Sequence, residues 1–369
     1  MSKKINQHYV PQFYFRLFSR DGRHVHSYMP KPGRLIHNAA IKGQCAKYDF
    51  YGDGTIEGPL SEIENEHAIA LRSLIEIAWS ETFPPLTPEI VRTTWQAVAL
   101  QQSRTELAAE LHSQSAEAMA TEAFTRHLMT APGINNRERL VSAMKTGEAK
   151  VTFSRSIAAF QNVVFALENW LLISDLDFIL LRNNTDYPFV FCDSPVVFAN
   201  SYYRNVTQRG VLGLQTPGLQ IFFPLDSDTM IMFFDAAVYR RPTNSCIVDL
   251  IHESDVSQLN ALQLHNHTRS IYFAHDDCGS YLQDLWSVHK KAVQKPRSNF
   301  VRRDGWLLDG APTNGLVQIF QPHPNIRLDL TFIQCDPIDE GQYRARRRSP
   351  SLVTEAEARA KRRMANRDD

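Results

Sequence analysis

The five cysteines of this 369-residue sequence are few and scattered. Their number is odd and no two form a CxxC pair, so neither a disulfide framework nor a zinc finger is predicted. Reduced thiols are typical of the cytoplasm. The sequence also has no uninterrupted apolar run of about 18–20 residues, the length that crosses a bilayer, and Lys3 and Lys4 lead directly into an aromatic segment. We therefore expect a cytoplasmic protein that does not insert into membranes.

Several common catalytic motifs are missing as well. The sequence has no GxxxxGK[ST] phosphate loop, no GxGxxG, no GxSxG and no HExxH. These absences disfavour a nucleotide-driven motor, a Rossmann oxidoreductase and a classical lipase. His24 and His26 are expected on one face of a strand, but two histidines alone are weak evidence for a metal site.

The net charge is zero, yet its distribution along the chain is uneven. Residues 344–369 carry nine Lys/Arg and four Asp/Glu, a net charge of +5, and the remainder is −5. Such a tail is either a solvated surface segment or a contact for phosphates, whose affinity falls with salt. RNA or DNA is the partner that it predicts, through a cluster of four arginines: Arg344, Arg346, Arg347 and Arg348.

The most unusual segment is Gln7–Phe18, QHYVPQFYFRLF, with five Tyr or Phe in twelve residues. Chain ends are normally poorly ordered, whereas this much aromatic area belongs inside a domain. Two interpretations are open. The segment is a first strand or extended arm that fills the core, with a structural His8, or Pro11 fixes the backbone and aims His8 for proton transfer or metal ligation.

The His-Tyr-Val-Pro string resembles the signature of the bacterial domain of unknown function 4238 family, whose members open with an HYVPxFYLR-like string. Phe15 replaces Leu here, and Arg16 is retained. The resemblance includes a Q-x-x-R string matched by Gln101 and Arg104, and an S-D-(N)-P-V-like string matched at Asp193. Uncharacterised families of this kind often travel with mobile elements, so the resemblance implies a toxic effector of antiphage defence.

The spacing of apolar residues predicts an α+β fold. Helices are expected at Pro59–Ser80, from Glu89 to about Met129, and at Val151–Ile173, the last apolar on nearly all sides and therefore in the middle of the molecule. A hairpin is expected at residues 219–234. We predict one large domain over residues 1–343, in which the helical part (about 59–173) packs on a mostly antiparallel sheet (about 175–336), followed by the basic tail.

Dispersed polar residues adjoin these predicted buried faces. Glu64 and His67 share a helix face, with a spacing that metal sites use, although acids also favour helix N-termini. Arg104 is suited to hold a phosphate or carboxylate, or to form an inter-helix salt bridge. Asp193 is either an exposed acid at a strand end or a turn residue that bonds its own backbone.

Together these residues predict a nuclease-like hydrolase that acts on nucleic acid. In this hypothesis His8 is the acid or base, Glu64 and Asp193 orient it or bind a divalent cation as a candidate cofactor, and Arg104 stabilises developing negative charge. Gln101 and the four tail arginines contact substrate. The alternative is a non-enzymatic module that senses a ligand or binds a protein.

Overall fold

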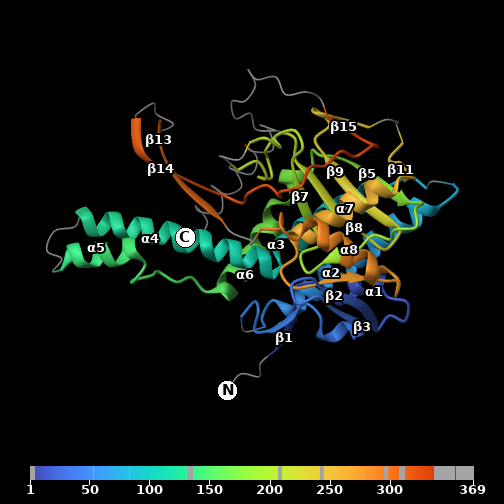
Figure 1. Ribbon diagram of the computed structural model, residues 1–369, viewed down its shortest axis with the longest axis horizontal. Helices are drawn as coiled ribbons and strands as arrows, with labels where there is room; N and C mark the ends of the chain where they lie inside the picture. The colour runs from blue at the N-terminus through green and yellow to red at the C-terminus, as the bar shows by residue number, and fades with distance from the viewer. Residues whose placement is uncertain are drawn as a thin grey trace.

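Two sheets, one of five strands and one of four, pack against the N-terminal aromatic segment (Figure 1). The computed structural model describes residues 5–52, 54–82, 84–130, 136–206, 210–241, 245–294, 298–306, 312–335 and 354. Within them, the larger sheet has the order β11-β5-β9-β8-β7 and is antiparallel except for the parallel pair of β11 and β5. Its strands are β5 (Asp177–Asn183), β7 (Val197–Ala199), β8 (Gln220–Pro224), β9 (Thr229–Phe234) and β11 (Ile247–Leu250).

The second sheet joins two strands from the start of the chain to two strands from its second half. It is fully antiparallel in the order β3-β2-β12-β6. Its strands are β2 (His24–Met29), β3 (Arg34–Ala40), β6 (Phe191–Cys192) and β12 (Ile271–Phe273). Three further strand pairs are β1 (Asn6–His8) with β4 (Ala46–Tyr48), β10 (Tyr239–Arg240) with β15 (Gln334–Cys335), and β13 (Asn299–Trp306) with β14 (Pro312–Phe320).

The helical region packs on these sheets, and the predicted α+β class is confirmed. α2 packs on α3 and β5, and α6 packs on both α3 and α4. Figure 1 shows α4 and α5 reaching away from the sheets. The helices are α1 (Gln12–Leu17), η1 (Ile41–Gly43), α2 (Glu57–Trp79), α3 (Pro88–Ser103), α4 (Glu106–Thr130), α5 (Arg137–Thr146), α6 (Arg155–Asn169), η2 (Trp170–Ile173), α7 (Glu253–Asn266) and α8 (Cys278–His289). The extent of one domain over residues 1–343 stays a prediction.

The prediction that α6 lies in the middle of the molecule is wrong. Its buried face is built from small residues such as Ala158, Ala159 and Val163, which let neighbouring helices approach closely. Large apolar side chains point outward, and Ile157 and Phe165 are about half exposed. The helical stretch Arg155–Ile173 is long and apolar enough to cross a membrane. This is weak evidence for a membrane span, because core helices of soluble proteins can have the same length and composition. That the protein is cytoplasmic and does not insert into membranes stays a prediction.

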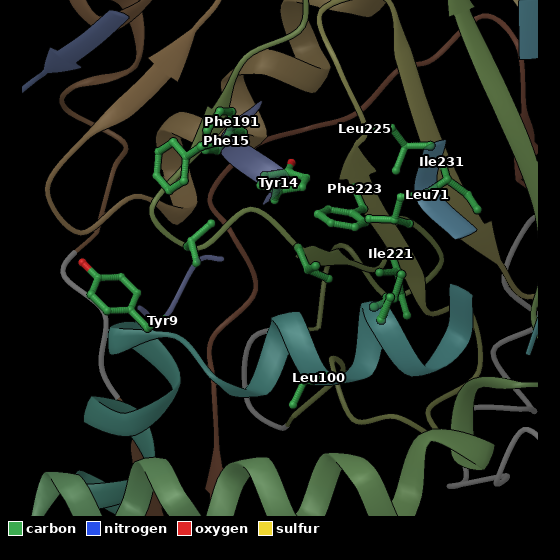
Figure 2. Close-up of a cluster of buried hydrophobic side chains, with 14 of the residues drawn as sticks. Tyr9, Tyr14, Phe15, Leu71, Leu100, Phe191, Ile221, Phe223, Leu225 and Ile231 are labelled. Carbon is green, nitrogen blue, oxygen red and sulfur yellow. The ribbon is translucent and has the colours of Figure 1, made fainter. Parts of the chain in front are cut away.

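The aromatic N-terminal segment lies in the core. Tyr14 stacks on Phe223 of β8 with ring centroids 5.0 Å apart, and it meets Phe191 of β6 edge-on. Phe15 and Phe18 pack on the same Phe191 ring. Figure 2 shows Tyr14 between Phe223 and the Phe15–Phe191 pair. Tyr14 thus contacts both sheets, and Phe15 and Phe18 add contacts to the second one.

Half of this segment is helical, so the expectation of a strand or extended arm holds only before α1, at β1. Pro11 is extended, with φ −69° and ψ 148°, and it caps α1. Proline suits the start of a helix because it has no N–H to satisfy. A six-residue helix is marginal in water alone, and here the burial of Tyr14 and Phe15 stabilises it.

Removing one hydroxyl tests how far the core depends on this segment. Tyr14 donates a hydrogen bond of 2.5 Å from its hydroxyl to the carbonyl of Pro224. We expect Tyr14→Phe to lower the free energy of unfolding by about 1–2 kcal/mol, because the hydrogen bond is lost inside the core. Urea denaturation measures the change. Tyr48→Phe is the matched control, since Tyr48 is 67% exposed, and equal effects in the two variants would contradict the assignment.

Candidate functional site

A buried arginine joins three segments that are remote in sequence. Arg104 follows the last turn of α3, where its backbone N–H bonds Leu100. Its Nη1 donates to Oε1 of Glu64 on α2 at 2.6 Å, and its Nη2 donates to the carbonyl of His8 at 2.7 Å. Its Nε donates to the Tyr51 hydroxyl at 3.1 Å. With its side chain 3% exposed, Arg104 positions these groups, and its placement does not favour direct contact with substrate.

The charge of this arginine is stable despite its burial. Burial opposes the charged form, but Tyr51 and Glu64 outweigh it and raise the pKa of Arg104 above its usual value. Glu64 is 24% exposed, so one end of the ion pair faces solvent. An arginine–carboxylate pair that is partly buried and hydrogen-bonded is rigid, and it holds α2, α3 and β1 in one arrangement.

His8 lies at the edge of this site. Its Nε2 lies 3.2 Å from the carbonyl of Lys42, and a carbonyl only accepts, so Nε2 carries the proton of the neutral ring and Nδ1 has the free lone pair. Burial lowers the pKa of His8; the Lys42 carbonyl and Glu64 partly offset it, and Arg104 adds to it. The imidazole is therefore neutral at pH 7 and able to accept a proton.

Two members of the site were missed by the sequence analysis, Tyr51 and Glu57. Glu57 opens α2 and lies seven residues before Glu64, which places both on one helix face. Burial raises the pKa of Glu57, while the charge of Arg104 lowers it and Glu64 raises it. An acid in the first turn of a helix is common, so only its proximity to Arg104, which the fold creates, distinguishes Glu57.

Gln101 supports the N-terminal segment. It is buried, and its Nε2 donates to the carbonyl of Tyr9 at 3.3 Å, so the structure does not favour its predicted contact with substrate. Gln101, Arg104 and His67 line a small cavity. Burial and the charge of Arg104 lower the pKa of His67 to about 4. A cation next to Arg104 would be repelled, and among the described residues Glu64 and His67 belong to no group with metal-ligand spacing.

Asp193 lies in a different environment from the predicted constellation. Its carboxylate accepts hydrogen bonds from the backbone N–H of Thr268 and Arg269 at 2.8 and 2.7 Å, and from the Thr268 hydroxyl at 2.6 Å. Burial raises its pKa, and the bonds from Thr268 partly offset this. Within the described part of the chain no hydrogen bond joins Asp193 to His8, Glu64 or Arg104. Asp193 therefore holds the remote turn between α7 and β12. Its role is structural, but among the described residues it does not bond the backbone of its own turn as the sequence suggested.

α7 is bonded to the Asp193 segment by a row of amide side chains. Asn260 and Gln263 each accept from one backbone N–H of the segment, at Val190 and Cys192, and each also donates to one of its carbonyls. Asn266 donates to the carbonyl of Ser194 at 2.6 Å. The spacing of three residues places these amides on one face of α7. The string around Asp193 is thus fixed by structural contacts on both sides.

A larger cavity of about 350 Å³ opens on the other side of α3. It lies between α3, α4 and α6, and its lining is mainly apolar with a few polar groups. Among these, Nδ1 of His112 lies 2.7 Å from Oδ1 of Asn162. Small-molecule sites have this size and composition. The predicted substrate-binding residues Arg344, Arg346, Arg347 and Arg348 lie outside the residues that the structure describes.

Comparison with known proteins places the chain in one family. A model of the family described as "Protein of unknown function (DUF4238)" matches residues 6–277. The match includes β1, α2, α3 and the Asp193 segment, and it confirms the resemblance inferred from the His-Tyr-Val-Pro string. No curated protein and no solved structure matches the chain.

A substitution that removes only one acceptor tests the structural assignment of Asp193. In Asp193→Asn, the amide nitrogen replaces one carboxylate oxygen and meets the N–H donors of the turn before β12. We expect a loss of about 3 kcal/mol in the free energy of unfolding, because buried donors are left unsatisfied. Chemical denaturation measures this, with Asp284→Asn on the exposed face of α8 as the control. Unchanged stability of Asp193→Asn would restore Asp193 as a candidate catalytic residue.

Proposed function

The chain belongs to the DUF4238 family, whose function is unknown, and from the site around Arg104 we propose that it is a hydrolase acting on nucleic acid. The observation that carries the proposal is that the charge of one buried arginine, Arg104, acts on two titratable groups, His8, whose pKa is lowered by burial, and Glu57, whose pKa is raised by burial. Burial favours the neutral form of both groups, an imidazole that can accept a proton and a carboxyl group that can donate one, and these are the two partners that general acid–base catalysis needs. The basic residues of the tail are the proposed contact for phosphates.

Each residue has one task in the proposed reaction. Water attacks the phosphorus of a phosphodiester, and its proton passes to Nδ1 of His8. Glu57, in the protonated form that its raised pKa favours, gives its proton to the oxygen that leaves. Arg104 holds the backbone of His8 and the carboxylate of Glu64 (2.7 and 2.6 Å), so it positions the base and does not contact the reacting atoms. In a cell such an activity degrades RNA or DNA, which is the chemistry of a toxic effector of antiphage defence.

The large cavity supports a second candidate function, the binding of a small molecule. Its volume of about 350 Å³ and its mainly apolar lining fit a ligand of modest size. α3 separates this cavity from the acid–base site, because Gln102 lines the cavity while Gln101 and Arg104 face the N-terminal segment. In this account the protein is a ligand sensor without turnover.

The test is hydrolysis of single-stranded RNA and DNA by purified full-length protein across pH 4.5–8.5. We expect a bell-shaped rate profile with its optimum below pH 7. The rate falls in acid because His8 must be neutral and falls in alkali because Glu57 must be protonated. His8→Gln should reduce the rate about 100-fold or more and Glu57→Gln about as much, since an acid–base group contributes about 10²–10⁴.

His24→Gln is the matched control, because His24 is a half-exposed histidine paired with Asp21. It should keep the wild-type rate, and expression of wild-type protein should slow growth while His8→Gln should not. Equal activity of His8→Gln and wild type would overturn the proposal. A protein with no hydrolytic activity whose melting temperature is raised by a small molecule would establish the sensor in its place.

A further inference from the structure

A second cluster of ligating side chains lies on the β2–β3 hairpin, among the described residues. His26 is in β2 and His37 in β3, and the pairing register of the two strands shifts between Val25 and Ser27. Asn38 next to His37 has a positive φ of 52°, in the left-handed region that side chains seldom adopt. Such bulges re-aim side chains and are frequent near functional sites. Here the irregular pairing brings the two imidazole rings to 5.6 Å between centroids.

The third member comes from the turn that follows β12. Oδ1 of Asp276 lies 3.0 Å from Nδ1 of His37 and 3.2 Å from Nδ1 of His26. β12 pairs with β2, and Phe273 stands directly opposite His26 and stacks on its ring. The position of Asp276 is therefore fixed by the sheet. One ligand atom from each of the three residues lies within 4.8 Å of the other two.

One ring nitrogen of His26, Nδ1, has no hydrogen-bond partner in the part of the chain that the structure describes. Its side chain is 10% exposed, and Nδ1 is buried without a hydrogen bond even though Asp276 is 3.2 Å away. The distance between Nδ1 of His26 and Oδ1 of Asp276 would allow a hydrogen bond, but the angle at these two atoms does not. A buried ring nitrogen without a hydrogen bond is costly, and a metal ion bound to this nitrogen would remove that cost.

From this geometry we propose that His26, His37 and Asp276 bind a divalent first-row transition metal such as Zn²⁺. Zinc bonds to nitrogen and carboxylate oxygen are about 2.0–2.2 Å, so neighbouring ligand atoms stand roughly 2.8–3.1 Å apart at right angles and roughly 3.3–3.6 Å apart in a tetrahedron. The two nitrogen–oxygen separations of 3.0 and 3.2 Å are within a few tenths of an ångström of these spacings. Two imidazoles and one carboxylate favour such metals over Mg²⁺, which prefers oxygen ligands. His37 and Asp276 are exposed, which leaves a coordination position open to water or a ligand.

Two titratable or charged residues near the cluster, Arg20 and His24, have partners of their own. Arg20 lies beside the cluster, and its Nη2 is 2.8 Å from Nδ1 of His275, so its donor is directed to that ring. His24 is turned to Asp21 at 2.6 Å and is outside the cluster. The sequence analysis paired His24 with His26, whereas the fold pairs His26 with His37. The proposed metal site does not depend on the proposed hydrolase.

The test is a titration of full-length, tag-free protein with Zn²⁺ after removal of metal by a chelator, followed by competition with a zinc-binding dye. We expect one Zn²⁺ per chain and a rise in melting temperature on binding. His37→Ala and Asp276→Asn should weaken binding more than about 100-fold, because even the loss of a group behind a ligand costs 10–100-fold. Both side chains are exposed, so these variants should fold as the wild type does.

Two control variants separate this site from adventitious binding by histidines. His24→Ala removes the neighbouring histidine on the same strand, and His289→Ala breaks the other close histidine pair, in which its Nδ1 lies 3.2 Å from Nε2 of His265. Both should keep wild-type affinity. Co²⁺ should give visible absorption bands that vanish in His37→Ala, and Mg²⁺ should not compete. Weak binding that is the same in His37→Ala, Asp276→Asn and the wild type would overturn the proposal.

Discussion

The structure depends on one charge held inside it, that of Arg104. Taking a guanidinium out of water is expensive, and the cost is met only when partners satisfy it. Here the partners are the Glu64 carboxylate, the Tyr51 hydroxyl and the His8 carbonyl. They belong to α2, to the segment before it and to β1, so the requirement to satisfy one arginine fixes three parts of the chain relative to α3.

This constraint also explains why an N-terminal segment serves as core. β1 supplies the His8 carbonyl to Arg104, and a few residues later Tyr14 and Phe15 of α1 fill the space between the two sheets. Fixing β1 therefore fixes α1. The proposed acid–base groups come close to Arg104 because of the same contacts. His8 is in β1 and Glu57 is at the start of α2, and Arg104 binds both of these elements. The proposed chemistry is thus a consequence of how the fold satisfies a buried charge.

Much of the fold was readable from local patterns, whereas the meeting of remote segments was not. The hairpin of β8 and β9 follows from turn signals. The break between α3 and α4 was not located, because no turn signal interrupts the helical run predicted from Glu89 to about Met129. The helix α1 was not predicted either, because its six residues are helical only by virtue of tertiary burial. The motif strings singled out His8 and Arg104, and the position on a helix singled out Glu64, and the structure brings the Glu64 carboxylate and the His8 carbonyl to Arg104. No pattern shows that Asp193 turns to Thr268. A register shift in a hairpin is equally invisible, so the closeness of His26 and His37 required coordinates.

The central claim is that the N-terminal segment belongs to the cooperative core because Arg104 anchors it. Hydrogen exchange of backbone amides in residues 7–18, followed by mass spectrometry, tests this most directly. The account predicts that these amides, including Tyr9 N–H bonded to Cys45, exchange as slowly as those of β9 in the wild type. In Arg104→Met both should exchange faster together. Rapid exchange of residues 7–18 in the wild type, with β9 still protected, would contradict it.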